Sequence, residues 1–204
     1  QPEKIDIKTF MNDLAEGINI LKSNRLISTM IGLGTLINFS VSPLFGIGLV
    51  YIFKQVLKVN DMQFGVFEMA LSASMLLAPV LCGGIIKKIR IGKLTYLSFT
   101  ITAVLILIMS VFPSGFILKA FNTNMVSYVG LLIISFVIGL VVAVANIAIG
   151  TLFNQVVPLE LMGRTSTVFN LAVTVFIPVG QMIFGFLYDI IIPEAVVIIS
   201  GIIL

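Results

Sequence analysis

The chain alternates long apolar stretches with short polar connections. Five of these stretches are long enough to cross a bilayer, and a sixth runs up to the last residue. A membrane-spanning helix needs about 20 predominantly apolar residues, and only helices and closed barrels satisfy their backbone hydrogen bonds in lipid. The pattern therefore predicts an all-α transmembrane protein with spans at 26–53, 62–86, 94–112, 125–153 and 168–188 and a partial span at 195–204.

Composition strengthens this prediction and argues against a soluble domain. Hydrophobic residues make up 59% of the chain and charged residues 10%, whereas a soluble domain carries about 25% charged residues. The sequence is basic, with a pI of about 9.1, but its basic residues lie in the connections between the spans. Because they form no basic stripe on a soluble domain, we expect no nucleic-acid partner.

The basic residues also predict how the chain is oriented in the membrane. Cytoplasmic connections of membrane proteins carry an excess of Lys and Arg. We therefore expect a cytoplasmic N-terminus, with the connections after the second and fourth spans on the same side. Nine basic residues fall on this side and three on the other: Lys4, Lys8, Lys22, Arg25, Lys87, Lys88, Arg90, Lys93 and Arg164 against Lys54, Lys58 and Lys119.

Residues 1–25 are predicted to form a cytoplasmic linker before the first span. Because the chain opens on a polar segment without a signal peptide, we expect it to be part of a longer protein. Within 9–23 the apolar residues recur at helical spacing, which is typical of a helix that lies on the membrane surface. These apolar residues are Phe10, Leu14, Ile18 and Leu21.

Polar and small residues distinguish some spans from others. Spans 26–53 and 125–153 each carry several glycines and an asparagine, so we expect them to be central, whereas 94–112 has no glycine and is expected to be peripheral. Stripes of polar residues on four spans predict a shared cavity, although ordinary helix packing explains any single stripe equally well. The candidate cavity residues are Asn38, Glu68, Ser72, Asn146, Asn170 and Gln181.

Glu68 is the only ionisable residue well inside a predicted span. It follows Met62 by six residues on an inward-running helix, which places it roughly 9 Å below the outer surface. A carboxylate is costly in hydrocarbon, so an intramembrane acid is a functional candidate for proton exchange or cation recognition. The alternative is a structural acid that is hydrogen-bonded or stays hydrated near the interface.

Spans 62–86 and 168–188 resemble each other. Each has a proline in its interior and ends with glycine and, four residues later, a charged residue. One span runs inward and the other outward, and inverted three-helix repeats are typical of transporter halves. These matches predict a 3+3 inverted repeat, and they comprise Pro79, Gly83 and Lys87 in one span and Pro178, Gly185 and Asp189 in the other.

Three segments resemble drug-efflux-like members of the major facilitator superfamily, the branch of macrolide-efflux-like and enterobactin-exporter-like proteins. Residues 13–24 read DLAEGINILKSN and resemble the stretch before the family's seventh helix. Residues 83–93 read GGIIKKIRIGK and resemble its glycine-and-basic loop between helices eight and nine, where the family often has an acid in place of Lys87. Residues 157–164 read VPLELMGR and resemble its turn into helix eleven.

These loops supply a second set of candidate residues. The resemblance implies a gating role for them, whereas anchoring to anionic lipid headgroups explains the basic cluster at least as well. Glu160 and Arg164 are four residues apart and are able to pair if the turn is helical. The candidates are Gly83, Gly84, Lys87, Lys88, Arg90, Gly92, Lys93, Pro158, Glu160, Gly163 and Arg164.

The resemblance covers essentially the whole chain and implies a specific role. Residues 26–204 would form helices seven to twelve, the C-terminal half of a secondary active transporter in a bacterial inner membrane. Such a protein would export amphipathic small molecules by alternating access, driven by protons and completed by an N-terminal half. We expect no cofactor and no metal.

Two other function classes remain open. An intramembrane enzyme is disfavoured because the chain has no histidine and no recognisable hydrolase motif, and it lacks a phosphate-binding loop for ATP. A non-transporting membrane scaffold or receptor would show spans without a polar cavity, which is not what the polar stripes predict.

Overall fold

The structure, a computed structural model, describes residues 25–121, 123–159 and 162–204, so the predicted surface helix at 9–23 lies outside the described residues. The described chain is helical, with no strand in these ranges. In order, the elements are α2 (Arg25–Leu36), the π-helical segments η1 (Ile37–Val41) and η2 (Leu44–Gly48), α3 (Leu49–Tyr51), the π-helical segment η3 (Ile52–Val56), α4 (Asp61–Lys88), α5 (Ile91–Met109), α6 (Gly115–Phe121), α7 (Asn124–Val156), α8 (Met162–Thr174), α9 (Phe176–Ile190) and α10 (Pro193–Ile203).

The all-α class predicted from the sequence is confirmed for the described residues, and the long apolar helices fit the predicted membrane protein. Five helical stretches are long and apolar enough to cross a membrane, and α10 is a shorter apolar helix. The third span ends at Met109, three residues before its predicted end, because Pro113 cannot continue a helix and disfavours helical geometry in the residue before it. The five spans are Arg25–Val56, Asp61–Gly84, Ile91–Met109, Asn124–Val156 and Thr165–Ile190.

Local side-chain chemistry sets where several helices begin. At the start of α4, Asn60 and Gln63 exchange hydrogen bonds: each backbone N–H donates to the other side chain, at 3.0 and 2.8 Å. This reciprocal capping satisfies two of the backbone donors that a helix start leaves free. The Thr123 hydroxyl accepts from the backbone N–H of Met125 at the start of α7, and Pro193 occupies the first turn of α10.

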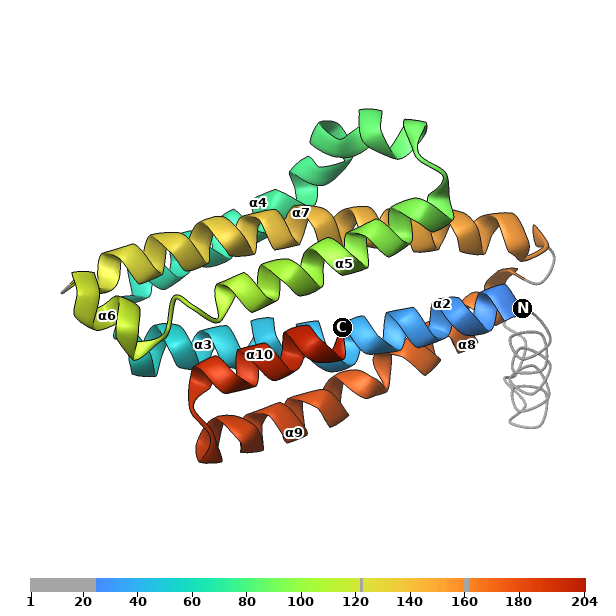
Figure 1. The fold of residues 1–204 in the computed structure, drawn as a ribbon. Coiled ribbons are helices and arrows are strands. Elements are labelled where there is room, and N and C mark those ends of the chain that lie inside the picture. Colours follow the sequence, from blue (N-terminus) through green and yellow to red (C-terminus); the bar gives the residue numbers. More distant parts are fainter. Residues whose placement is uncertain (1–24, 122, 160–161) are drawn as a thin grey trace, which may run out of the picture.

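Two long spans, the fourth and the first, organise the bundle (Figure 1). The fourth span, α7, packs along both α4 and α5. The first span packs along the fifth, through α2 with α8 and through η1 and η2 with α9. The short helix α10 lies against α5 and also touches η1 and η2, so it joins the two groups.

The predicted ranking of central and peripheral spans is partly wrong. In the most apolar part of each span, 44% of residues are buried in the first and fourth spans, which agrees with the prediction that they are central. The corresponding share is 33% in α5, against 22% in the fifth span and 17% in α4. The third span is therefore not the most peripheral one in this chain. Three of its polar residues, Thr95, Ser98 and Thr102, are buried, and α5 packs along α7 and α10.

The predicted cytoplasmic connections lie together at one end of the bundle. The start of α2, the α4–α5 connection and the α7–α8 connection share this end, and α6 lies at the other (Figure 1). At that other end Lys54 forms an ion pair with Asp61 across the turn between the first two spans, with 2.5 Å between Lys54 Nζ and Asp61 Oδ1. In the described part of the chain, the connections with many basic residues and those with few therefore lie at opposite ends of the bundle.

Candidate transport cavity

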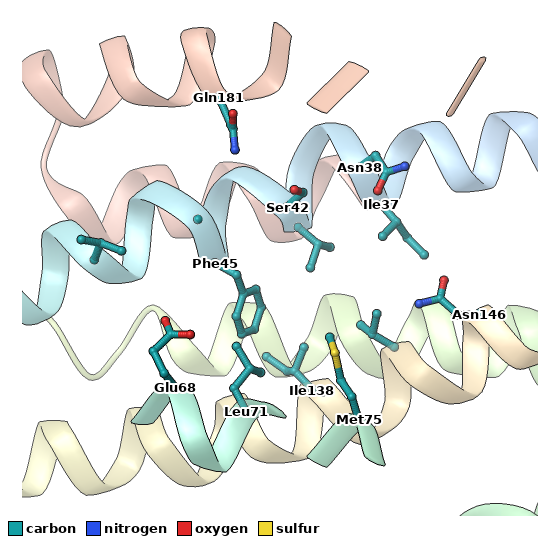
Figure 2. Close-up of a pocket in the computed structure, with 15 residues that line it drawn as sticks. Ile37, Asn38, Ser42, Phe45, Glu68, Leu71, Met75, Ile138, Asn146 and Gln181 are labelled. Carbon is teal, nitrogen blue, oxygen red and sulfur yellow. The ribbon is translucent and has the colours of Figure 1, made fainter. Parts of the chain in front are cut away.

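Four spans surround a cavity of about 470 Å³. Four of the six predicted cavity residues line it: Asn38 from the first span, Glu68 from α4, Asn146 from α7 and Gln181 from α9. Figure 2 shows these side chains around one space, with Phe45, Leu71, Met75 and Ile138 between them.

π-helical winding explains how the first span presents one face to this cavity. Asn38, Ser42, Gly46 and Val50 all line it, at a constant spacing of four residues. In an α-helix with 3.6 residues per turn, each step of four residues drifts by about 40° around the axis, so this face would turn away. The i to i+5 hydrogen bonds of a π-helix widen each turn and cancel the drift. Thus η1 and η2 hold four successive residues of the stripe in register.

Pro43 and Gly180 account for the first of these π-helical segments. The ring of Pro43 clashes with the carbonyl four residues earlier in a regular helix, so the turn around Phe39 must widen. A Cβ added at Gly180 would come within 2.5 Å of the Phe39 carbonyl oxygen, so α9 approaches η1 as closely as only glycine allows. The Ser200 hydroxyl of α10 donates to the Ser40 carbonyl at 2.8 Å, which satisfies an acceptor in the same segment.

Among the described residues, Glu68 is the only ionisable one that lines the cavity, and no basic side chain of this part of the chain lines it. The Glu68 side chain is exposed and forms no ion pair in the described ranges, where the pair between Lys54 and Asp61 is the one found. An unpaired carboxylate in an otherwise uncharged cavity attracts a cation or a proton.

The side chain of Asn38 forms a hydrogen bond to the fifth span. Asn38 Nδ2 donates to the Val173 carbonyl at 3.0 Å. This carbonyl lies just before the break between α8 and α9 and next to the Thr174 carbonyl, which Pro178, without an N–H, leaves without its regular helical donor. Asn38 therefore stabilises the break and leaves its Oδ1 as an acceptor.

A second cavity of about 250 Å³ adjoins the first and shares Ile37, Asn38 and Asn146 with it. Asn170, the fifth predicted cavity residue, lines this second cavity. The break at Val175 separates Asn170 in α8 from Gln181 in α9, so the single stripe predicted along the fifth span is divided between the two cavities.

Ser72, the sixth predicted cavity residue, lines neither of these two cavities. The face of α4 that lines the first cavity carries Glu68, Leu71 and Met75. Ser74, on the same helix, fits against Gly139 of α7 so closely that a Cβ at Gly139 would overlap its hydroxyl. This contact sets the rotation of α4 and leaves Ser72 exposed outside the cavities.

Several loop candidates lie within helices, and none of those that the structure describes lines either cavity. Helix α4 continues to Lys88 and α5 begins at Ile91, so Gly83, Gly84 and Gly92 lie within helices. A Cβ at any of these three glycines, or at Gly163, would meet nothing within 4 Å, so none of them mediates close packing. Lys88, Arg90, Lys93 and Pro158 are exposed, as expected for headgroup contacts. Glu160 and the side chains of Lys87 and Arg164 lie outside the described part, so the predicted Glu160–Arg164 pair stays a prediction.

Two close helix contacts have the same form. Gly139 of α7 faces Ser74 of α4, and Gly34 of α2 faces Val173 of α8, with a Cβ at Gly34 reaching within 2.9 Å of the valine. Ser74 and Val173 each lie five residues before the interior proline of their span, Pro79 and Pro178. In both contacts, therefore, a glycine of a central span packs against the residue that lies five positions before the proline of the neighbouring span.

The apolar lining is what the sequence analysis missed. Phe45, Leu71, Met75 and Val142 contribute much of the wall, and no single-residue signal distinguishes them from the many other apolar residues of the spans. Within the described ranges no three His, Cys, Asp or Glu side chains gather, so we assign no metal site. No family model, curated protein or solved structure matches the chain.

Proposed function

We propose that this chain forms one half of a secondary active transporter that exports amphipathic small molecules by alternating access. The observation that carries the proposal is the cavity between four spans, which combines one carboxylate, several amides and an adaptable Phe and Met lining. Small-molecule sites are concave and mostly apolar, with a few polar groups that fix orientation. A secondary transporter places such a site near the bilayer midplane, between repeated helical units.

The paired packing supports a 3+3 inverted repeat of the major facilitator type. The fourth span packs on the second as the first packs on the fifth, and the third span packs on the sixth. If the first, second and third spans are exchanged with the fourth, fifth and sixth, the same pairs of spans are in contact. The glycine contacts at Ser74 and Val173 obey the same exchange, and corresponding spans run in opposite directions (Figure 1).

Alternating access calls for a second half that rocks against this one. We therefore propose a partner unit of six helices, the N-terminal half in the major facilitator arrangement, that closes the cavity from the other side. Vesicles that contain only these 204 residues should then show no saturable flux. Saturable flux from this chain alone would contradict the requirement for a partner half.

Proton coupling is the proposed energy source, with Glu68 as the group that exchanges the proton. The supporting observation is that no other ionisable side chain of the described residues lines the cavity. One carboxylate that binds either a proton or a cationic substrate couples the two in opposite directions, because both compete for the same charge.

The test uses inside-out membrane vesicles from cells that produce the natural gene product. A fluorescent amphipathic cation should accumulate when the vesicle lumen is acidified, and a protonophore should collapse this accumulation. Vesicles from cells without the gene serve as the control. Accumulation that needs ATP would overturn the proposed coupling. Binding of the dye without any flux would overturn transport and favour the receptor alternative.

A further inference from the structure

The carboxylate and the asparagines of the two joined cavities lie at opposite ends. Figure 2 shows Glu68 and Asn146 at opposite ends of the first cavity, with Phe45, Leu71 and Met75 along one wall between them and Ser42 and Gln181 on the facing helices. The second cavity shares Asn38 and Asn146 with the first and adds Asn170, and among the described residues no ionisable one lines it. The enclosure thus runs from a carboxylate, along an apolar wall, to a group of asparagines.

The asparagines at the far end have free hydrogen-bonding capacity. Among the described residues, the side chains of Asn146 and Asn170 have no hydrogen-bond partner, and Asn38 uses only its Nδ2. A carboxamide inside a membrane is costly unless it meets a partner or water. Each carboxamide both donates and accepts, so together they suit an uncharged group that does the same.

The distance between the two ends follows from how α4 and α7 pack. The two helices run in parallel, because the Tyr128 hydroxyl donates to the Gln63 carbonyl near their starts and Ser74 meets Gly139 further along. Glu68 lies six residues before Ser74, and Asn146 lies seven residues after Gly139. At a rise of 1.5 Å per residue, the two polar ends are roughly 20 Å apart along the helices.

We propose that the joined cavities bind a two-headed amphipathic molecule. Its cationic head, an ammonium group, would lie at Glu68, and its uncharged head, an amide or hydroxyl group, would lie at Asn38, Asn146 and Asn170. An apolar spacer of roughly 20 Å would join the heads along Phe45, Leu71 and Met75. This inference rests on the proposed function and specifies the substrate class of the same site. Among the described residues no basic side chain lines either cavity, whereas an anionic head would call for one.

Calorimetry on the natural gene product in lipid nanodiscs tests the proposal with three probes. The first is a straight alkyl chain of the inferred length with a trimethylammonium group at one end and a primary amide at the other. The second ends in a methyl group in place of the amide, and the third carries both heads on a spacer of half the length. The first probe should bind roughly three- to tenfold more tightly than the second, the range that one net hydrogen bond provides. The short probe should lose this advantage.

Two variants and one control locate the heads. In Asn170→Ala the first and second probes should bind with equal affinity, while the unchanged affinity for the methyl-ended probe shows that the variant is folded. Glu68→Gln should weaken both probes by the same factor. Ser72→Ala, on an exposed side chain outside both cavities, should change neither.

The outcomes separate this inference from the proposed function. Equal binding of the first two probes by the unaltered protein would overturn the two-headed ligand, and dye transport in vesicles would then still support the transporter. An advantage that persists in Asn170→Ala, or at half the spacer length, would also overturn it. If no probe binds and no dye is transported, the cavity is not a binding site and both proposals fail.

Discussion

At the scale of single residues, we expect the largest effects of substitution at a charged residue in the cavity and at a glycine in a tight helix contact. Glu68 is a carboxylate that forms no ion pair with any described residue, and Gly180 occupies a place where no side chain fits. Each of these residues is therefore expected to respond to substitution in a way that its neighbours do not.

Glu68→Gln in the natural gene product should abolish export or change which substrates are exported, while the protein is produced at a normal level. Glutamine keeps the volume and hydrogen-bonding capacity of glutamate but does not ionise. The measurement is dye accumulation in vesicles, normalised to the amount of protein in the membrane.

Two other results would remove Glu68 from the site. Unchanged transport would mean an acid that is already protonated and only structural. A loss of folded protein would mean a paired structural carboxylate whose partner is left uncompensated.

Gly180→Ala should lower the stability of the bundle by roughly 1–3 kcal/mol, because the added methyl group overpacks a tight contact. The nearest atom is a backbone oxygen of η1, Phe39 O, which cannot swing aside. The thermal unfolding midpoint of the purified protein in detergent, followed by circular dichroism, measures the effect.

Gly185→Ala, on the same helix α9, is the matched control. Its added Cβ would meet only Ile47 at 3.9 Å, an ordinary contact, and alanine is favoured over glycine inside a helix by roughly 0.5–1 kcal/mol. This variant should be as stable as the unaltered protein or slightly more so. Equal behaviour of the two variants would contradict the close approach of α9 and η1.

At the scale of elements, winding decides which residues face the cavity. The first span contains three π-helical segments, although π-helix accounts for well under 1% of residues in proteins. Hydropathy identifies a helical span but carries no information on its hydrogen-bond register. Pro43, Gly46 and Gly48 are the only local signs of irregular winding. Contacts from α9 and α10 hold the wide turn, and these depend on the tertiary fold.

Cysteine scanning along the first span should reveal a period of four. On a Cys82→Ser background, a water-soluble thiol reagent should label cysteines at 38, 42, 46 and 50 and leave those at 40, 44 and 49 unmodified. Leu44 and Leu49 are fully buried, whereas Val50 lines the cavity and is 37% exposed. Labelling at 49 in place of 50 would indicate regular α-helical winding and contradict the π-helical register.

At the scale of the whole molecule, charge sets the orientation and packing sets the site. The α4–α5 connection and α6 lie at opposite ends of the bundle (Figure 1). The positive-inside rule predicts that the end with the α4–α5 connection is cytoplasmic and that the end with α6 faces outward, and labelling from each side of the membrane tests this.

Arg90→Cys, again with Cys82→Ser, should react with an impermeant thiol reagent only from the cytoplasmic side. Lys119→Cys in α6 is the matched control and should react from outside on intact cells. Both side chains are exposed, so access through the protein does not limit either reaction. Labelling of position 90 on intact cells would reverse the predicted orientation.

The sequence by itself determined the all-α class, the number and approximate bounds of the long apolar spans, and four of the residues that line the first cavity. These follow from properties that act locally: apolar length, turn residues such as Pro113, and the cost of placing Glu68 or an asparagine in lipid. Tertiary structure decided the rest. The rotation of α4, set by the contact of Ser74 with Gly139, excluded Ser72 from the cavity. The break at Val175 separated Asn170 from Gln181, and the burial of α5 required neighbours that its uniform composition does not specify. Helix rotation and winding depend on close contacts between residues far apart in the chain, and the apolar pattern of a membrane span is nearly the same on every side.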